Sequence, residues 1–319
     1  MNIKQLKKMP KIDSHNHLFD SRLRSKSIKN PFLDLSFDTY TAKDLKKDLK
    51  EYSVKKAVVF PLPSESYECK KSNLLILESA RRDNTLLPVA YLPKNCSLKD
   101  MFRYAHQGFV GFKIYSGISK SLAHDLAQVN LPIIVHPPFP PSSPNFSEMI
   151  NQFKNTPQII LAHMGRAYTL TELKSLLKVI KNKPNIFVDT SAFTAKSIII
   201  ERIITSIGPS RVLFGSDFPF GNLEGFQMKV PKSILPKEHQ HLAGIRILVS
   251  EKKYKWNIPE LINLSKKLKL PKIVAHKKSS GQLFKVLIKL LKKGIINEND
   301  INNIFYNNAS QLFEKNKHK

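Results

Sequence analysis

Short apolar runs alternate with amphipathic helical stretches along the first two thirds of the chain, and eight of these runs have the length and composition of β-strands. Several runs are apolar at consecutive positions, which is typical of parallel strands buried on both faces. From the second run onward they begin about 22 to 31 residues apart, the length of one βα unit. The runs span residues 11–17, 55–60, 86–92, 108–115, 131–136, 158–163, 185–191 and 211–217.

Eight βα units favour a closed barrel over an open doubly wound sheet, and no glycine-rich phosphate loop follows the first run. The intervening stretches have helical spacing and helix-end signals. One opens at Thr41 with Asp44 three residues on, which is close to a capping box. Another, 169–183, repeats apolar positions every three or four residues and stops before Pro184. We therefore expect an α/β fold, a TIM-type (β/α)₈ barrel.

After Asp217 the pattern loosens, and we expect a loop over the barrel mouth at 220–257, where such barrels carry insertions. Helices are expected at 258–269 and 282–293. The stretch 270–276 resembles a strand, and we assign it to the same extension. A last helical segment would pack four apolar side chains against the barrel: Ile301, Ile304, Phe305 and Phe313.

The predicted domain organisation is a single barrel domain over 1–319, with 220–280 as an insertion or extension near the mouth. The chain begins without the apolar segment of a signal peptide, and no run approaches the ~18 apolar residues of a membrane span. We expect a cytoplasmic protein without membrane contact. The two cysteines, Cys69 and Cys96, form no metal-binding pattern.

The net charge of +27 raises the question of nucleic-acid binding. The lysines are spread along the chain, mostly at helical spacing opposite leucine and isoleucine, as on solvated helix faces. No arginine-rich tract or aromatic platform accompanies them. The distribution of the lysines therefore indicates a general compositional bias and argues against a nucleic-acid partner. The positive field would still favour anionic small-molecule substrates.

Polar residues at the ends of the predicted strands carry the candidate chemistry. His15 and His17 are two apart on an extended run, so both side chains project from one face. His136, His163 and Asp217 each end a later run. Catalytic groups of a TIM barrel collect at these strand ends. Two or three neutral imidazoles and a carboxylate are suitable ligands for a catalytic Zn²⁺ or a similar ion.

This set of residues resembles the amidohydrolase superfamily. The resemblance lies in HxH on the first strand, a lysine in GFKIY on the fourth, single histidines ending the fifth and sixth, and GSDFP ending the eighth. The segment INENDINNIFYNNASQLF is similar to the C-terminal helix of the amidohydrolase-related branch, which includes aminocarboxymuconate-semialdehyde decarboxylase. The resemblance covers 11–217 and roughly 296–314.

The resemblance implies that one divalent cation is held by His15, His17, His136 and Asp217, with zinc expected first and manganese or iron as alternatives. It also implies that His163 acts as a general acid/base or electrostatic group. Asp217 could take a proton from water. Relatives are often dimers, which makes a homodimer one expected state.

Lys113 has three interpretations: an unmodified lysine that orients an anionic substrate group, which we favour, a structural lysine, or a carbamate that bridges two metals. Tyr115, Arg166 and Ser191 also lie near strand ends. Arg166 could clamp a substrate carboxylate or cap a helix, and we assign it with Tyr115 to substrate binding.

The leading functional hypothesis is a metal-dependent hydrolase of a small, anionic, amide or ester-like substrate. The main alternative is a nonoxidative decarboxylase of a small unsaturated or aromatic acid, with His163 as proton donor. A TatD-type nuclease is less favoured, because such enzymes resemble one another in a strand-four glutamate where this chain has Lys113. A binding barrel that has lost catalysis is the fourth hypothesis.

Overall fold

The computed structural model describes residues 1–23, 39–62, 68–115, 119–191, 196–220, 225–229, 246–250, 274–275 and 279–315. All eight predicted strands are present and lie parallel in a nine-stranded sheet of order β2-β1-β3-β4-β5-β6-β7-β8-β9. The ninth strand, β2 (Thr39–Tyr40), pairs antiparallel with the end of β1. The parallel strands are β1 (Lys11–Asp20), β3 (Val54–Pro61), β4 (Leu86–Tyr91), β5 (Gly111–Ile114), β6 (Ile133–Val135), β7 (Ile159–Leu161), β8 (Ile186–Asp189) and β9 (Val212–Leu213).

Backbone hydrogen bonds join the two ends of the sheet. The amide of Ser14 donates to the carbonyl of Phe214 over 2.9 Å, and the amide of His17 donates to the carbonyl of Phe218 over 2.8 Å. These bonds place the segment after β9 against β1. The (β/α)₈ barrel expected from the sequence is confirmed.

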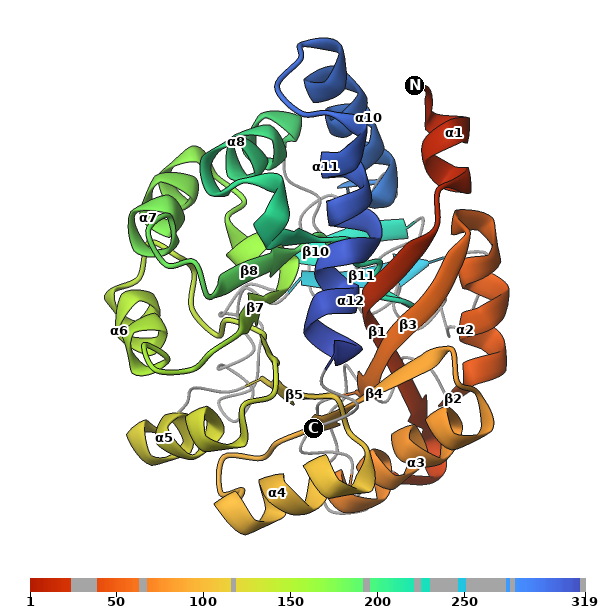
Figure 1. Ribbon diagram of the computed structural model, residues 1–319, viewed down its shortest axis with the longest axis vertical. Helices are drawn as coiled ribbons and strands as arrows, with labels where there is room; N and C mark the ends of the chain where they lie inside the picture. The colour runs from red at the N-terminus through yellow and green to blue at the C-terminus, as the bar shows by residue number, and fades with distance from the viewer. Residues whose placement is uncertain are drawn as a thin grey trace, which may run out of the picture.

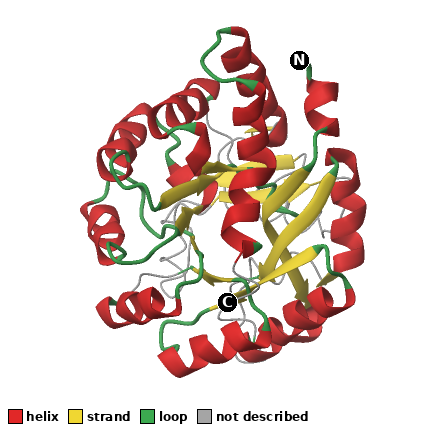
Figure 2. Cartoon of the chain, in the orientation of Figure 1, coloured by secondary structure: helices red, strands yellow, loops and turns green. Residues whose placement is uncertain are grey.

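Helices cover the outside of the strands (Figures 1 and 2). The predicted helix start at Thr41 is confirmed, because Thr41 and Asp44 form a capping box. Thr169 and Glu172 form another at the start of α7. The surrounding helices are α2 (Ala42–Leu49), α3 (Cys69–Arg82), α4 (Leu98–Gln107), α5 (Lys120–Val129), α6 (Pro144–Gln152), α7 (Leu170–Ile180), α8 (Ser197–Ile207) and α10 (Ser279–Lys292), and α1 (Ile3–Lys8) precedes β1.

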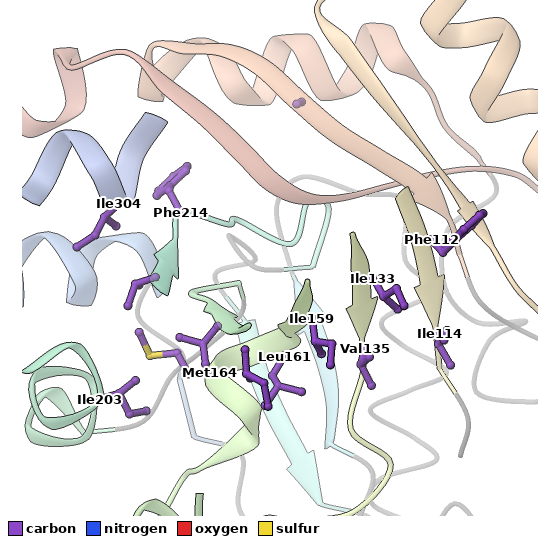
Figure 3. Packing of buried hydrophobic residues seen from close by; sticks show 14 of the residues in the cluster. Phe112, Ile114, Ile133, Val135, Ile159, Leu161, Met164, Ile203, Phe214 and Ile304 are labelled. Carbon is purple, nitrogen blue, oxygen red and sulfur yellow. The ribbon is translucent and has the colours of Figure 1, made fainter. Parts of the chain in front are cut away.

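The core has two layers because alternate residues of each strand point to opposite faces. Ile133 and Val135 of β6 pack outward against the helices, in the layer drawn in Figure 3. Ile134, between them, belongs to a second cluster that fills the barrel interior together with Val58 and Phe60. Both layers are apolar, which explains why the strands read as continuous apolar runs.

The last helical segment crosses one end of the barrel in Figure 1. It comprises α11 (Glu298–Asn302), a π-helical turn (Asn303–Asn307) and α12 (Asn308–Phe313). All four predicted apolar contacts are confirmed as fully buried. Phe313 joins the interior cluster, and the carbonyl of Ile304 accepts a bond from the amide of Phe214 over 2.9 Å. This segment therefore closes the N-terminal end of the barrel.

The region between β9 and α10 differs from the expected irregular loop. It contains β10 (Gly225–Lys229), β11 (Arg246–Ser250) and β12 (Val274–Ala275), which form a separate three-stranded sheet. β10 pairs antiparallel with both others. β12 lies within 270–276, the stretch that resembles a strand in the sequence. β10 and β11 are short and pair with distant partners, so local patterning gives little sign of them. The helix expected at 258–269 lies outside the described residues, and α10 confirms the one expected at 282–293.

Candidate active site

β1 brings His15 and His17 to the barrel mouth. Both side chains are buried, with relative exposures of 0% and 4%. Their ring centroids lie 5.5 Å apart, and each ring meets the edge or face of Phe60 at 4.8 Å. The apolar ring of Phe60 therefore shields one side of both imidazoles from water.

Asp217 reaches the same point from the turn after β9. Its φ of 63° places it in the left-handed region, and its amide donates to the carbonyl of His15 over 2.8 Å. The turn comes close to β1 because Gly215 has no side chain: a Cβ there would lie 3.2 Å from the Cβ of His15. The carboxylate Oδ1 then lies 3.4 Å from His15 Nε2 and 3.1 Å from His17 Nε2.

The hydrogen bonds of the two imidazoles fix which nitrogens carry protons. A carboxylate or carbonyl oxygen only accepts, so Nδ1 of His15 donates to Asp189 Oδ2 over 2.8 Å and Nδ1 of His17 donates to the carbonyl of Pro61 over 3.4 Å. In a neutral ring, Nε2 then carries a lone pair. Among the described residues, Nε2 of His15 has no hydrogen-bond partner although it is buried.

Three acceptors, two imidazole nitrogens and a carboxylate oxygen, therefore face one another in a buried site. His15, His17 and Asp217 can offer ligand atoms that all lie within 4.8 Å of one another. Acceptors this close repel unless a cation lies between them. This donor set fits a divalent metal ion with N and O ligands.

Burial shifts the charges in the direction that metal binding needs. It lowers the pKa of His15 to about 3, assisted by the nearby charge of Lys113, and it also lowers the pKa of His17. Burial alone would raise the pKa of Asp217, but the neighbouring imidazoles, His15 first, lower it overall. The imidazoles are thus neutral and the carboxylate ionised at neutral pH, which is the state in which they bind metals.

His136 and His163 form a second pair beside this group. His163 Nδ1 donates to the carbonyl of Ser191 over 2.8 Å, so its Nε2 accepts from His136 Nδ1, 3.1 Å away. That leaves Nε2 of His136 unprotonated. His136 lies outside the group formed by His15, His17 and Asp217, so its role as fourth ligand stays a prediction.

An unusual backbone turn carries His163. Residues 163 to 166 all have positive φ, at 55°, 49°, 65° and 62°. Only the third is glycine. Gly165 also packs closely on Leu176, because a Cβ at this position would lie 2.8 Å from the leucine side chain. Left-handed conformations cost non-glycine residues about 1–2 kcal/mol each. The surrounding contacts must offset this cost to hold His163 in place.

The predicted substrate residues lie around the same mouth. Lys113 is fully buried on β5, and its Nζ lies 4.7 Å above the ring of Phe60 and 4.6 Å above that of Tyr115. Burial lowers the pKa of Lys113 to about 7. The Tyr115 hydroxyl is 3.4 Å from His17 Nε2, and its ring stacks on His136.

Arg166 extends from the same left-handed turn as His163. Its Nη1 donates to the carbonyl of Pro137 over 2.9 Å, next to His136 in the chain. The charge of Arg166 contributes to the lowered pKa of His136, after the larger effects of burial, His163 and Lys113. Arg166 is therefore close enough to act on the contents of the mouth.

Asp189 is a site residue that the sequence analysis missed. It is fully buried at the end of β8, and its two oxygens contact His15, the amide of His163 and Ser191. Burial alone would raise its pKa, but the charge and hydrogen bond of His15 lower it overall. The signal was available, because an aspartate ends the apolar run of the seventh strand just as Asp217 ends the eighth.

Comparison with known proteins identifies the family. The family profile described as Amidohydrolase matches residues 12–238. The chain belongs to the amidohydrolase family. It is thus a metal-dependent enzyme of that family, as its sequence resemblance implied. No curated protein matches the chain with significance.

Solved structures of the amidohydrolase fold are similar over nearly the whole chain. A probable 2-pyrone-4,6-dicarboxylic acid hydrolase from Acinetobacter baumannii with citric acid bound has a TM-score of 0.59 at 15% identity, covering 96% of this chain and 100% of that one. A 2,6-dihydroxybenzoate decarboxylase with 2,6-dihydroxybenzoate has a TM-score of 0.55 at 14% identity, covering 96% and 99%. An amidohydrolase from Burkholderia multivorans with bound zinc has a TM-score of 0.62 at 11% identity, covering 96% and 99%. At these identities the likeness concerns the fold.

None of the helices in the described part of the chain is long and apolar enough to cross a membrane.

Proposed function

We propose that this amidohydrolase uses one divalent cation, zinc first among the candidates, to hydrolyse a small anionic amide or ester-like substrate. The observation that carries the proposal is the buried group of three acceptors, His15, His17 and Asp217, in which Nε2 of His15 has no hydrogen-bond partner among the described residues. His136 would complete the ligand set through its unprotonated Nε2.

A bound cation would lower the pKa of a water molecule and polarise a substrate oxygen. The protein's part is proton transfer. His163 is anchored through Nδ1 to the carbonyl of Ser191, so Nε2 is the atom that can take or give a proton. Asp217 could accept a proton through the carboxylate it directs at the two histidines of β1.

Two cationic groups support an anionic substrate. Lys113 has no hydrogen-bond partner among the described residues although it is buried, so a substrate carboxylate could supply one. A guanidinium has five N–H donors, and toward the described residues the side chain of Arg166 donates one hydrogen bond, to the carbonyl of Pro137. Tyr115 borders the same space and would contact the substrate through its ring or hydroxyl.

Decarboxylation is the second candidate. It is supported by the same carboxylate-binding groups and by His163, whose Nε2 could deliver a proton to carbon instead of to a leaving group. The two reactions differ in their products. Hydrolysis in ¹⁸O-labelled water places the label in the organic product, whereas decarboxylation releases carbon dioxide and adds no oxygen from water to the organic product.

The test is metal analysis and activity of the wild type and His136→Ala over a panel of small anionic amides, lactones and unsaturated acids. We expect about one metal per chain in the wild type, and a loss of activity of at least about 100-fold in the variant. His124→Ala, an exposed histidine on α5, is the matched control. Unchanged activity of metal-replete His136→Ala would overturn the mechanism.

Three broader properties belong to the same proposal. We infer a single domain spanning 1–319, with 220–280 extending near the mouth, a homodimer in solution and a cytoplasmic location. Light scattering coupled to gel filtration measures the mass in solution, and limited proteolysis tests whether 220–280 is cleaved while the barrel stays intact.

A further inference from the structure

Asp189 lies between the two halves of the candidate active site. It is fully buried at the end of β8, and each of its oxygens has a different task. Oδ2 accepts the Nδ1 proton of His15 over 2.8 Å. Oδ1 accepts from the amide of His163 over 2.9 Å, from the amide of Ser191 over 3.1 Å and from the Ser191 hydroxyl.

The bond to His15 controls which nitrogen of that ring can bind a cation. A neutral imidazole has one proton, and a carboxylate that only accepts holds that proton on Nδ1. Nε2 then presents its lone pair to Asp217, 3.4 Å away. Without the acceptor, the proton could move to Nε2 and block the ligand position.

The bonds from Oδ1 hold the other half of the site. The turn at 163–166 keeps four consecutive residues at positive φ, which is costly for the three that are not glycine. The amide of His163, at its start, donates to Asp189. Ser191 connects the same carboxylate to the ring, because its carbonyl accepts from His163 Nδ1.

Asp189 is unsuited to be a metal ligand itself. Both of its oxygens already accept N–H or O–H donors, and it is not part of the group of residues that can share an ion. Its contacts are those of a residue that orients ligands.

We propose that Asp189 is a positioning residue that fixes the tautomer of His15 and the turn of His163 with one carboxylate. It thereby couples the metal site to the acid/base histidine. This inference rests on the proposed metal-dependent function and adds a residue to it.

The main experiment compares Asp189→Asn with the wild type by metal titration. The amide has nearly the same shape, but it can place an NH₂ donor opposite His15 Nδ1 and so favour the Nε2–H tautomer. We expect zinc affinity to fall by about 10- to 100-fold. Asp48→Asn, at a buried carboxylate on α2 that accepts from Tyr40, is the matched control and should bind zinc as the wild type does.

A second readout needs no metal. In ¹⁵N-labelled metal-free protein, the ring nitrogen shifts of His15, assigned by their disappearance in His15→Gln, report the tautomer directly. The wild type should show the Nδ1–H form and Asp189→Asn the Nε2–H form. An Nε2–H form in the wild type would overturn the inference even if the variant does not fold.

The outcomes separate the two proposals. If the wild type binds no zinc, the proposed function fails, while the tautomer measurement still tests Asp189. If the wild type binds zinc and Asp189→Asn binds it equally well with an unchanged tautomer, the role of Asp189 fails alone. Ser191→Ala should leave zinc affinity within about 3-fold, because it removes no contact to His15. A loss of zinc affinity in Ser191→Ala as large as in Asp189→Asn would indicate general disruption of the site instead.

Discussion

Among the described residues, each end of the barrel fully buries one lysine, and these two, Lys11 and Lys113, have opposite surroundings. Lys11 begins β1 at the end closed by α12, and its Nζ donates to the carbonyls of Leu6, Lys7, Met9 and Tyr52 over 2.6 to 3.1 Å. Lys113 lies near the mouth, and its Nζ has no hydrogen-bond partner among the described residues. Burial lowers the pKa of both to about 7.

Burial alone therefore does not distinguish a structural lysine from a functional one. Lys11 satisfies the last carbonyls of α1 and lies 4.6 Å above the ring of Phe305, so it holds two elements together. The unsatisfied buried atoms of β1 and β5, Asp13 Oδ2, His15 Nε2 and Lys113 Nζ, belong to strands that form the active site. Other buried side-chain atoms among the described residues also have no partner, namely those of Ser72, Gln152, Thr156, Gln158 and Gln282. A missing partner therefore indicates a ligand site only where it coincides with other evidence, as it does beside the acceptors of His15, His17 and Asp217.

The largest effect is expected at the mouth, from His17→Ala. Removing a ligand should lower kcat/KM by about 1000-fold, equivalent to about 4 kcal/mol of transition-state stabilisation. The free energy of unfolding of metal-free protein should change by less than about 2 kcal/mol. The lost contact with Phe60 is offset in part, because the variant removes a buried imidazole nitrogen that faces a carboxylate oxygen 3.1 Å away. Steady-state kinetics and urea unfolding measure the two quantities. A large loss of stability without loss of metal binding would contradict the division between the ends.

Lys11→Met tests the closed end. The variant removes an ammonium whose three N–H groups are shared among four carbonyls, and each unsatisfied buried group costs about 1–3 kcal/mol. We expect the free energy of unfolding to fall by about 3 kcal/mol or more, with kcat/KM per folded molecule unchanged. Lys8→Met, an exposed lysine at the end of α1, is the control and should stay within about 0.5 kcal/mol of the wild type.

Lys113→Met should stabilise the protein, whereas Lys11→Met should destabilise it. In metal-free protein the substitution removes a buried, unpaired amine and should raise the free energy of unfolding at pH 6 by about 2–4 kcal/mol. The folded pKa is about 7 and the unfolded value is 10.5, so between these values the unfolded wild type binds more protons and its stability rises with pH. The advantage of the variant should shrink over this range. An advantage that does not depend on pH would show that folding leaves the pKa of Lys113 unchanged, so that the buried amine stays charged throughout this range.

Much of the barrel and half of the site could be predicted from the sequence. Strand patterning, capping residues and strand-end histidines are local signals, and they located the eight strands, His15, His17 and Asp217. The pairing of His136 with His163 depends on ring orientation, which spacing does not encode. All four residues of the turn at 163–166 are left-handed, and only one of them is glycine. Tertiary contacts therefore fix this turn, and the local sequence does not predict it.

The two buried lysines show the same limit of prediction from local sequence. Lys11 and Lys113 each interrupt an apolar run, and the pattern indicates only that both are close to a core. The hydrogen-bond partners of Lys11 lie up to 41 residues away, and its aromatic neighbour Phe305 belongs to the last helical segment. The neighbouring ring of Phe60 reaches Lys113 from another strand. Asp189 was missed for a different reason, since its position at a strand end was visible but carboxylates that orient ligands have no spacing rule of their own.

The helix that closes the barrel also constrains how the chain can acquire its structure. Ile12 and Phe313 belong to one interior cluster, so that cluster cannot be complete on the ribosome until residue 313 has left the exit tunnel. Until then the nascent chain exposes apolar strand faces to solvent. Such contacts between distant parts of the sequence slow folding, and we expect molecular chaperones to bind this protein during and shortly after its synthesis.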